Sequence, residues 1–206
     1  MKHIELPKGQ PLEWYLEQEI RLAQDVQDEM FFCWSVKPTV IYGRHQDVNA
    51  EVNIDFCRAR DINIVQRKSG GGCVYADEGN LMISLISPDT HSEAVFARFL
   101  NLLAQGLRSL GLPAVTTEHN DILVDGRKVS GNACYALPDA TIVHGTLLYD
   151  VNLDVLEHAI TPSAAKLGKH AVQSVRQRVA NIRPMLPGIR SIDELRDAIC
   201  QYWLIN

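Results

Sequence analysis

The sequence lacks the cysteine pattern of a disulfide framework and that of a thiolate zinc site. Its five cysteines are an odd number, and no two of them form a C-x-x-C pair. This pattern is typical of a reducing compartment and predicts a cytoplasmic protein. The chain also has no apolar run long enough to span a bilayer, and its N-terminal segment carries charges where a signal peptide has its apolar core. We therefore expect no membrane partner.

An excess of positive charge is missing as well. The 206 residues include 20 Lys and Arg against 25 Asp and Glu, which gives a formal net charge of −5. This balance argues against a protein that coats nucleic acid with its whole surface. The chain is 46% hydrophobic and 22% charged, without a repeat or a linker, as in an ordinary globular protein. Its length predicts one domain over residues 1–206.

Helical periodicity and short apolar runs alternate along the chain without a regular βαβ order. We expect helices at 11–26, 55–60, 92–110 and 192–203. We expect strands at 30–36, 39–42, 62–65, 81–86, 122–124, 128–130 and 140–151. The pair Asp125-Gly126 predicts a tight hairpin between two of these strands. The fold class indicated is α+β, with a mixed, largely antiparallel sheet flanked by helices.

A glycine-rich loop, Ser69–Gly72, follows the strand expected at 62–65. Three successive glycines let a backbone approach a ligand closely and point its N–H groups at an anion. Arg67 and Lys68 stand beside them and supply positive charge. The loop matches neither the P-loop nor the dinucleotide fingerprint, and by itself it is equally consistent with a plain turn.

Other polar candidates lie near the predicted hairpin and on the strand that follows it. Asn120 and Asp121 place a carboxamide beside a carboxylate, a combination that suits Mg²⁺ and nucleotide contacts. Lys128 on a rigid hairpin can hold a positive charge against a phosphate. The alternation of the later strand puts His144 and Thr146 on one face. The ordinary alternatives are a solvated surface lysine and a hydrogen-bonded core histidine.

Five blocks in this order resemble the lipoate-protein ligase A family, within the wider group of biotin and lipoate ligases. The blocks are residues 42–46, 67–75, 77–80, 126–133 and 144–148, and the resemblance continues to about Asn181. It implies a catalytic domain of the class II synthetase-like kind that activates lipoate with ATP and Mg²⁺ to lipoyl-AMP. The acyl group then passes to a lysine of a lipoyl acceptor domain, of a 2-oxoacid dehydrogenase or of the glycine cleavage H protein.

The resemblance also implies residue roles by position in its motifs. It makes Lys128 the catalytic lysine between the acyl carbonyl and the adenylate phosphate, and Asp121 the metal ligand. The acyl-binding residues that it implies are Arg67, Ser69, Gly70, Gly71, Gly72, Tyr75, His144 and Gly145, with Tyr75 lining an apolar tunnel. The nucleotide-binding residues that it implies are Asn120, Ser130, Gly131 and Ala133.

The chain departs from the family pattern at three places. Tyr135 stands where an arginine is frequent, and Ala76 stands where a histidine is frequent. Many ligases of the family continue into an accessory domain, which we expect to be absent here because the sequence stops at Asn206. A separate accessory subunit for adenylation is therefore one alternative. Such a chain should transfer from lipoyl-AMP faster than it makes lipoyl-AMP.

Two further alternatives belong to other functional classes. An ATP-independent octanoyl or lipoyl transferase of the same fold would use a cysteine thiolate, but the segments 118–121 and 161–163, where such transferases place it, contain no cysteine. The other alternative is a non-catalytic binding protein that has kept the pocket. Biotin ligation is disfavoured because biotin ligases of this group carry a more arginine-rich glycine loop.

A basic stretch separates Glu157 from Asp193. It contains no acidic residue, and its basic residues are Lys166, Lys169, Arg176, Arg178, Arg183 and Arg190. Such asymmetry in a negatively charged protein predicts a surface for an acidic partner, such as a lipoyl acceptor domain. A solvated helical face without a partner is the alternative.

Overall fold

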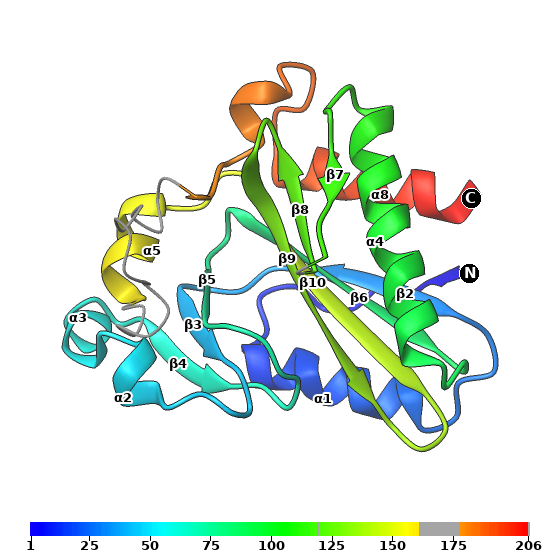
Figure 1. Cartoon of the computed structure of the whole chain (residues 1–206), viewed down its shortest axis with the longest axis horizontal. Coiled ribbons are helices and arrows are strands. Elements are labelled where there is room, and N and C mark those ends of the chain that lie inside the picture. The colour runs from blue at the N-terminus through cyan, green and yellow to red at the C-terminus, as the bar shows by residue number, and fades with distance from the viewer. Residues whose placement is uncertain (119, 161–177, 206) are drawn as a thin grey trace.

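The chain folds into two β-sheets with helices packed around them (Figure 1). This computed structural model describes residues 1–118, 120–160 and 178–205. The larger sheet has seven strands, in the order β1 (Lys2–His3), β2 (Met30–Trp34), β6 (Asn80–Ser87), β10 (Thr141–Leu148), β9 (Arg127–Ala136), β8 (Asp121–Val124) and β7 (Val115–Thr116). Its neighbouring strands are antiparallel except β1 and β2, which are parallel.

The smaller sheet has three strands, in the order β4 (Asn63–Gln66), β3 (Thr39–Tyr42) and β5 (Val74–Ala76). Strand β3 runs parallel to β4 and antiparallel to β5. The predicted α+β class with a largely antiparallel sheet is therefore confirmed. The strands expected on either side of Lys37-Pro38 are present as β2 and β3, but they lie in different sheets.

Helices cover both faces of the larger sheet. Helices α4 (Ser92–Ser109) and α8 (Ile192–Ile205) pack on one face, where the ring of Trp203 meets Phe99 edge to face at 5.5 Å. Helix α1 (Leu12–Ala23) packs on the other, where Tyr15 stacks on Trp34 at 4.7 Å (Figure 1). Because both faces are covered, every residue of the central strands β6 and β10 is buried.

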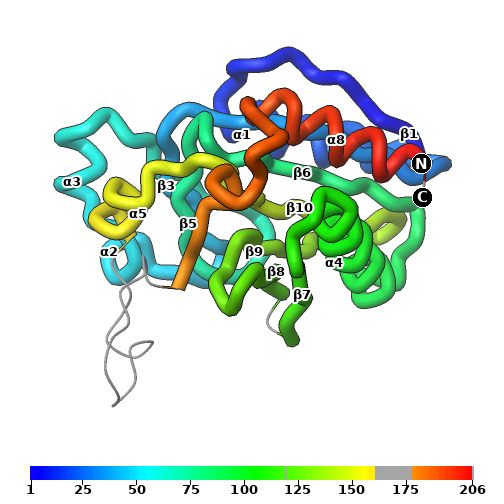
Figure 2. Tube along the Cα trace, turned by 90° about the horizontal axis from the view of Figure 1, so that it is seen from above, coloured from blue at the N-terminus to red at the C-terminus, as the bar shows by residue number. Residues whose placement is uncertain are grey.

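The smaller sheet has its own layer of short helices. Helices α2 (Val48–Glu51), α3 (Ile54–Ala59) and α5 (Leu153–Ala159) contribute to a third apolar cluster, and Figure 2 shows α5 beside β5 and α3. A 3-10 turn, η1 (Arg183–Met185), follows before α8. No helix within the described ranges is long and apolar enough to cross a membrane.

Candidate active site

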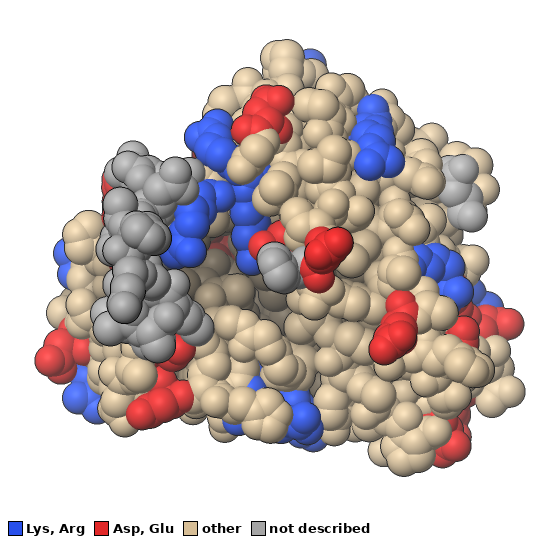
Figure 3. All heavy atoms as spheres, viewed as in Figure 1, with Lys and Arg blue, Asp and Glu red and all other residues tan. Residues whose placement is uncertain are grey.

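Two adjoining cavities form one cleft in the molecule, and Figure 3 shows the surface hollowed at its centre. The first cavity has a volume of about 230 Å³ and the second about 600 Å³. They share the wall residues Gly72, Cys73, Val74, Asp121, Lys128 and Thr146. A molecule that occupies one cavity can therefore react with a molecule in the other at this shared wall.

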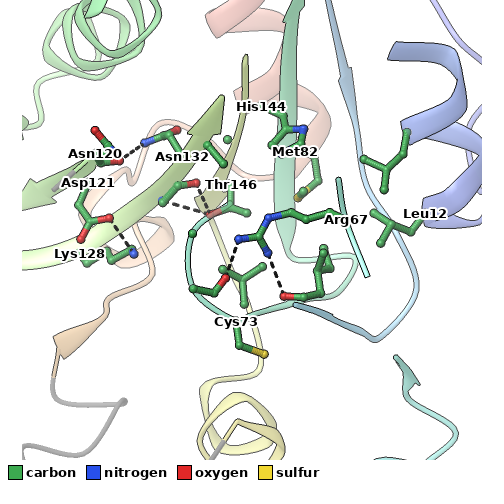
Figure 4. A pocket seen from close by; sticks show the side chains of 18 of the residues that line it. Leu12, Arg67, Cys73, Met82, Asn120, Asp121, Lys128, Asn132, His144 and Thr146 are labelled. Carbon is green, nitrogen blue, oxygen red and sulfur yellow. Dashed lines mark hydrogen bonds and ion pairs between the residues drawn. The ribbon is translucent and has the colours of Figure 1, made fainter. Parts of the chain in front are cut away.

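The first cavity combines an apolar part with a polar end (Figure 4). Its apolar walls are Leu12, Leu16, Trp34, Ile41, Val74 and Met82. Its polar side chains are Arg67, Asn120, Asp121, Lys128, Asn132, His144 and Thr146. A largely apolar pocket with a few convergent polar groups fits a small molecule that has a hydrocarbon chain and one polar end.

Arg67 organises the glycine-rich loop from inside. Its Nη2 donates to the carbonyls of Gly70 and Gly72, both at 2.7 Å, and its Nη1 donates to the Ile41 carbonyl at 3.1 Å. Burial lowers the pKa of this guanidinium, although the neighbouring Cys73 acts in the opposite direction. The carbonyls of Gly70 and Gly72 thus face Arg67. In the described part of the chain no hydrogen bond uses the N–H groups of Gly71 or Gly72, which suits an anion.

A buried polar network lies behind the loop. It consists of Trp34, Ser84, Glu19, His144, Ser69 and Arg67. Within it, Nε2 of His144 lies 2.7 Å from the Ser69 Oγ, and Nδ1 of His144 lies 3.1 Å from each Glu19 carboxylate oxygen. His144 is therefore the hydrogen-bonded histidine that the ordinary alternative expected, and it also lines the first cavity.

The predicted hairpin holds Lys128 at the shared wall. Asp125 and Gly126 have φ angles of 50° and 74°, as a type I′ turn requires. A bulge pairs Ile122 with Ser130 but Leu123 with Lys128, which leaves one extra residue in β9. As a result Lys128 lies over Gly131, where an added Cβ would come within 2.9 Å of the lysine Nζ. Glycine at 131 makes room for the lysine.

The Lys128 ammonium has one carboxylate partner in the cleft. Its Nζ lies 2.8 Å from Oδ1 of Asp121, and the two side chains are 33% and 26% exposed (Figure 4). Such a partly exposed pair contributes little to stability.

The second cavity has a basic wall. Arg127, Lys128 and Arg178 line it together with apolar residues of β10, α5 and the following segment. Lys and Arg side chains gather beside the central hollow in Figure 3. Positive charge at the wall of a roomy cavity suits a polyphosphate.

The structure brings together most of the predicted site residues. Those that line the first cavity are Arg67, Gly71, Gly72, Asn120, Asp121, Lys128, Gly131, Ala133, His144 and Gly145. Tyr75, which was predicted to line an apolar tunnel, lines the second cavity and not the first. The reason is the sheet: β5 pairs Tyr75 with Val40, on the side of the third apolar cluster. Burial, and next the charge of Asp77, raise the pKa of Tyr75.

Three other predicted residues lie outside both cavities. Ser69 belongs to the buried polar network, and the Gly70 carbonyl faces Arg67. Ser130 is fully buried, and its Oγ donates to Oδ1 of Asn132 at 3.1 Å. Direct contact of these three residues with a ligand stays a prediction.

Glu19 was not among the predicted site residues, although the sequence contains a signal for it. Leu12, Tyr15 and Ala23 are buried on one stripe of α1, and Glu19 stands on the same stripe, four residues before Ala23. A carboxylate within an apolar stripe is 3% exposed here and needs hydrogen-bond partners. The apolar walls Trp34 and Met82 had no comparable signal.

The basic stretch is described only in part. Lys166, Lys169 and Arg176 lie outside the described residues. Arg183 forms an ion pair with Asp150, and Arg178 lines the second cavity. The role of the basic stretch as a surface for an acidic partner stays a prediction.

Comparisons with known proteins agree with this geometry. The family model of the lipoyl protein ligase A/B catalytic domain matches residues 12–204. The chain is 36% identical to lipoate-protein ligase 1 of Staphylococcus aureus over 185 residues, which are 89% of this chain and 56% of that protein. It thus spans about half the length of the curated relatives it matches.

Solved structures show the same fold. A lipoate-protein ligase A bound with ATP has a TM-score of 0.85 at 25% identity, covering 98% of this chain and 83% of that one. A protein of T. acidophilum with bound lipoic acid has a TM-score of 0.84 at 25% identity, covering 98% and 84%. A bi-partite lipoate protein ligase of T. acidophilum, studied with its E2 lipoyl domain, has a TM-score of 0.83 at 26% identity, covering 98% and 81%.

Proposed function

Because the chain belongs to the lipoyl protein ligase A/B catalytic domain family, we propose that it is the catalytic domain of an ATP-dependent lipoate-protein ligase. The observation that carries the proposal is the pair of cavities joined at Lys128. One cavity suits the carbon chain of lipoate and the other suits the phosphates of ATP. Relatives solved with ATP and with lipoic acid support both assignments.

In the proposed first step, a lipoate carboxylate oxygen attacks the α-phosphorus of ATP, and pyrophosphate leaves. The acyl chain lies along Leu16, Trp34 and Met82, while the N–H groups of Gly71 and Gly72 receive the carboxylate. Arg127 and Arg178 bind the phosphates. Lys128 at the shared wall stabilises the negative charge that develops between carboxylate and phosphate.

In the proposed second step, the amine of an acceptor lysine attacks the carbonyl carbon of lipoyl-AMP, and AMP leaves. Lys128 then donates a hydrogen bond to the carbonyl oxygen as it becomes negative. Both steps depend on holding the reacting atoms together rather than on a covalent enzyme intermediate. The proposal therefore needs no nucleophilic side chain.

Magnesium fits this site through a single carboxylate. Among the residues that the structure describes, no three metal-binding side chains cluster, but Asp121 lies at the wall where the ATP phosphates are proposed to bind. Mg²⁺ characteristically takes one or two carboxylates and completes its shell with phosphates and water. When bound, the ion would neutralise phosphate charge, and Asp121 would hold it.

Lipoyl acceptor domains are the proposed partners. The relative studied with its E2 lipoyl domain supports this, and acceptors of 2-oxoacid dehydrogenases or the glycine cleavage H protein are the specific proposal. A separate accessory subunit for adenylation is the alternative, which the bi-partite nature of the same relative supports. A cytoplasmic location is proposed as well, from the odd number of cysteines without a C-x-x-C pair.

The function is tested by the mass of an acceptor domain after incubation with the protein. We expect the lipoyl mass gain with lipoate only when ATP is added, and with preformed lipoyl-AMP in the absence of ATP. A gain from lipoyl-AMP alone would assign only the second step to this chain and indicate a separate subunit for the first. No gain from either donor would contradict the proposal.

The transferase alternative makes the opposite prediction for cysteine. We expect Cys73→Ala and Cys134→Ala to retain ATP-dependent transfer within about tenfold, because each change alters only a small packing volume. Burial raises the pKa of the Cys134 thiol, so the thiolate that a transferase needs is disfavoured there. Intact mass after an acid quench is the measurement. An acyl thioester trapped on either residue would favour the transferase.

A further inference from the structure

We propose that Glu19 is a positioning residue for this reaction. Its carboxylate fixes which ring nitrogen of His144 carries a proton, and this sets the direction of the Ser69 hydroxyl behind the glycine-rich loop. The inference rests on the proposed function for its kinetic test, and on the geometry alone for its structural test. Glu19 itself does not line the first cavity, so it acts through its neighbours.

The burial of Glu19 requires an explanation. The residue is 3% exposed in α1 and lies between the helix and the larger sheet. In the described part of the chain its partners are the Ser84 hydroxyl, which donates to Oε1 at 2.6 Å, and Nδ1 of His144. Removing a carboxylate from water is costly, and here hydrogen bonds offset that cost without a lysine or arginine. An apolar residue would fill the same helix position at a lower cost.

The proton positions in the network follow from two groups that can only donate, Nε1–H of Trp34 and Nε–H of Arg67. Nε1–H of Trp34 donates to the Ser84 Oγ at 2.9 Å, so the proton of Ser84 is free to point at Glu19. A carboxylate only accepts, so Nδ1 of His144 must carry a proton to donate to it. In the neutral ring Nε2 is then an acceptor.

The other half of the network completes the pattern. Ser69 Oγ lies 2.7 Å from Nε2 of His144, and it already accepts from Nε of Arg67 at 3.1 Å. Its own proton therefore points to His144, so every donor in the chain of groups has an acceptor. Because Arg67 also holds the Gly70 and Gly72 carbonyls, the orientation of Ser69 is linked to the shape of the loop.

Glutamine at position 19 would keep the shape of the side chain but change which groups donate and which accept in this network. Its amide carries an NH2 group in place of one oxygen, and because both Glu19 oxygens lie 3.1 Å from Nδ1 of His144, this group faces His144 in either orientation of the amide. An amide N–H opposite His144 requires an unprotonated Nδ1, which moves the ring proton to Nε2. Ser69 would then face N–H donors from both His144 and Arg67, and its own hydroxyl would lose its acceptor.

The first test is the tautomer of His144 in the unaltered protein. We expect ¹⁵N NMR of histidine-labelled protein, assigned with His144→Gln, to show a proton on Nδ1 and none on Nε2 at a pH where the ring is neutral. The pattern should reverse in Glu19→Gln and persist in Glu19→Asp, which keeps a carboxylate. An unprotonated Nδ1 in the parent would overturn the proposal, whether or not the chain is a ligase.

The second test is kinetic. We expect Glu19→Gln to lower kcat/KM for lipoate at least tenfold with the KM for ATP little changed, and Glu19→Asp to recover part of the loss. The matched control is Glu17→Gln, an exposed carboxylate on the same helix, which should behave as the parent. Glu19→Gln within threefold of the parent would overturn the proposal. Failure of the parent to lipoylate the acceptor from either donor, lipoate with ATP or lipoyl-AMP, would instead contradict the proposed function.

Discussion

Lys128→Ala is expected to lower ligation at least 10²-fold while the protein stays folded. Removing one preorganised group that stabilises developing charge in a water-poor site characteristically costs about 10²–10³-fold in rate. Lys128 is the lysine at the wall shared by the two cavities. Its partly exposed pair with Asp121 contributes little to folding, so the melting temperature should change little.

The measurement is the rate of acceptor lipoylation together with thermal unfolding. Lys2→Ala is a matched control, because Lys2 also forms a 2.8 Å pair with an aspartate, Asp28, but on the surface. Lys128→Arg should not restore the rate, since a planar guanidinium presents its donors in a different geometry from the compact ammonium. Turnover of Lys128→Ala within a few fold of the parent would show that the lysine has no catalytic role.

Gly43→Ala is expected to disable the site from outside it. Gly43 follows β3 and lies against the glycine-rich loop, where an added Cβ would sit 2.4 Å from the Gly71 carbonyl oxygen and 3.3 Å from Nη2 of Arg67. The first of these atoms is backbone, so the loop must move. A misplacement of about 1 Å can cost about 10²-fold in rate, and we expect a loss of that order in ligation from lipoate.

Gly188→Ala provides the control for the glycine change. Its added Cβ meets nothing within 4 Å, and its backbone does not require glycine. We expect this variant to ligate and unfold as the parent does. The affinity for lipoate, measured by titration calorimetry, should fall in Gly43→Ala. Normal affinity and rate in Gly43→Ala would show that the loop tolerates the displacement.

Much of the fold was predictable because it depends on local patterns. The four expected helices correspond to α1, α3, α4 and α8, and the seven expected strands are all present. Strands β1, β5 and β7 were missed because two or three residues are too few to show a period. Strand β9 extends to Ala136, beyond the expected end at residue 130, because it pairs with β10 along this length.

The site was predictable where its residues lie close together in one segment of the sequence. Asp121, Lys128 and Gly131 share a hairpin whose turn residues indicate it directly. The bulge that aims Lys128 could not be predicted, since it depends on pairing across two strands. Glu19 was missed for a related reason: a periodicity analysis treats a glutamate as a surface residue, and its partners are distant in sequence.

The distances along the chain between members of the buried polar network bear on how the protein folds. Glu19 and His144 are 125 residues apart, and Ser69 and His144 are 75 apart. Contacts of this kind form only after large loops close, and chains rich in them fold slowly. No hairpin or helix pair could assemble the cleft alone. During refolding the secondary structure should therefore appear first, and the binding of lipoate should return only with the last cooperative step.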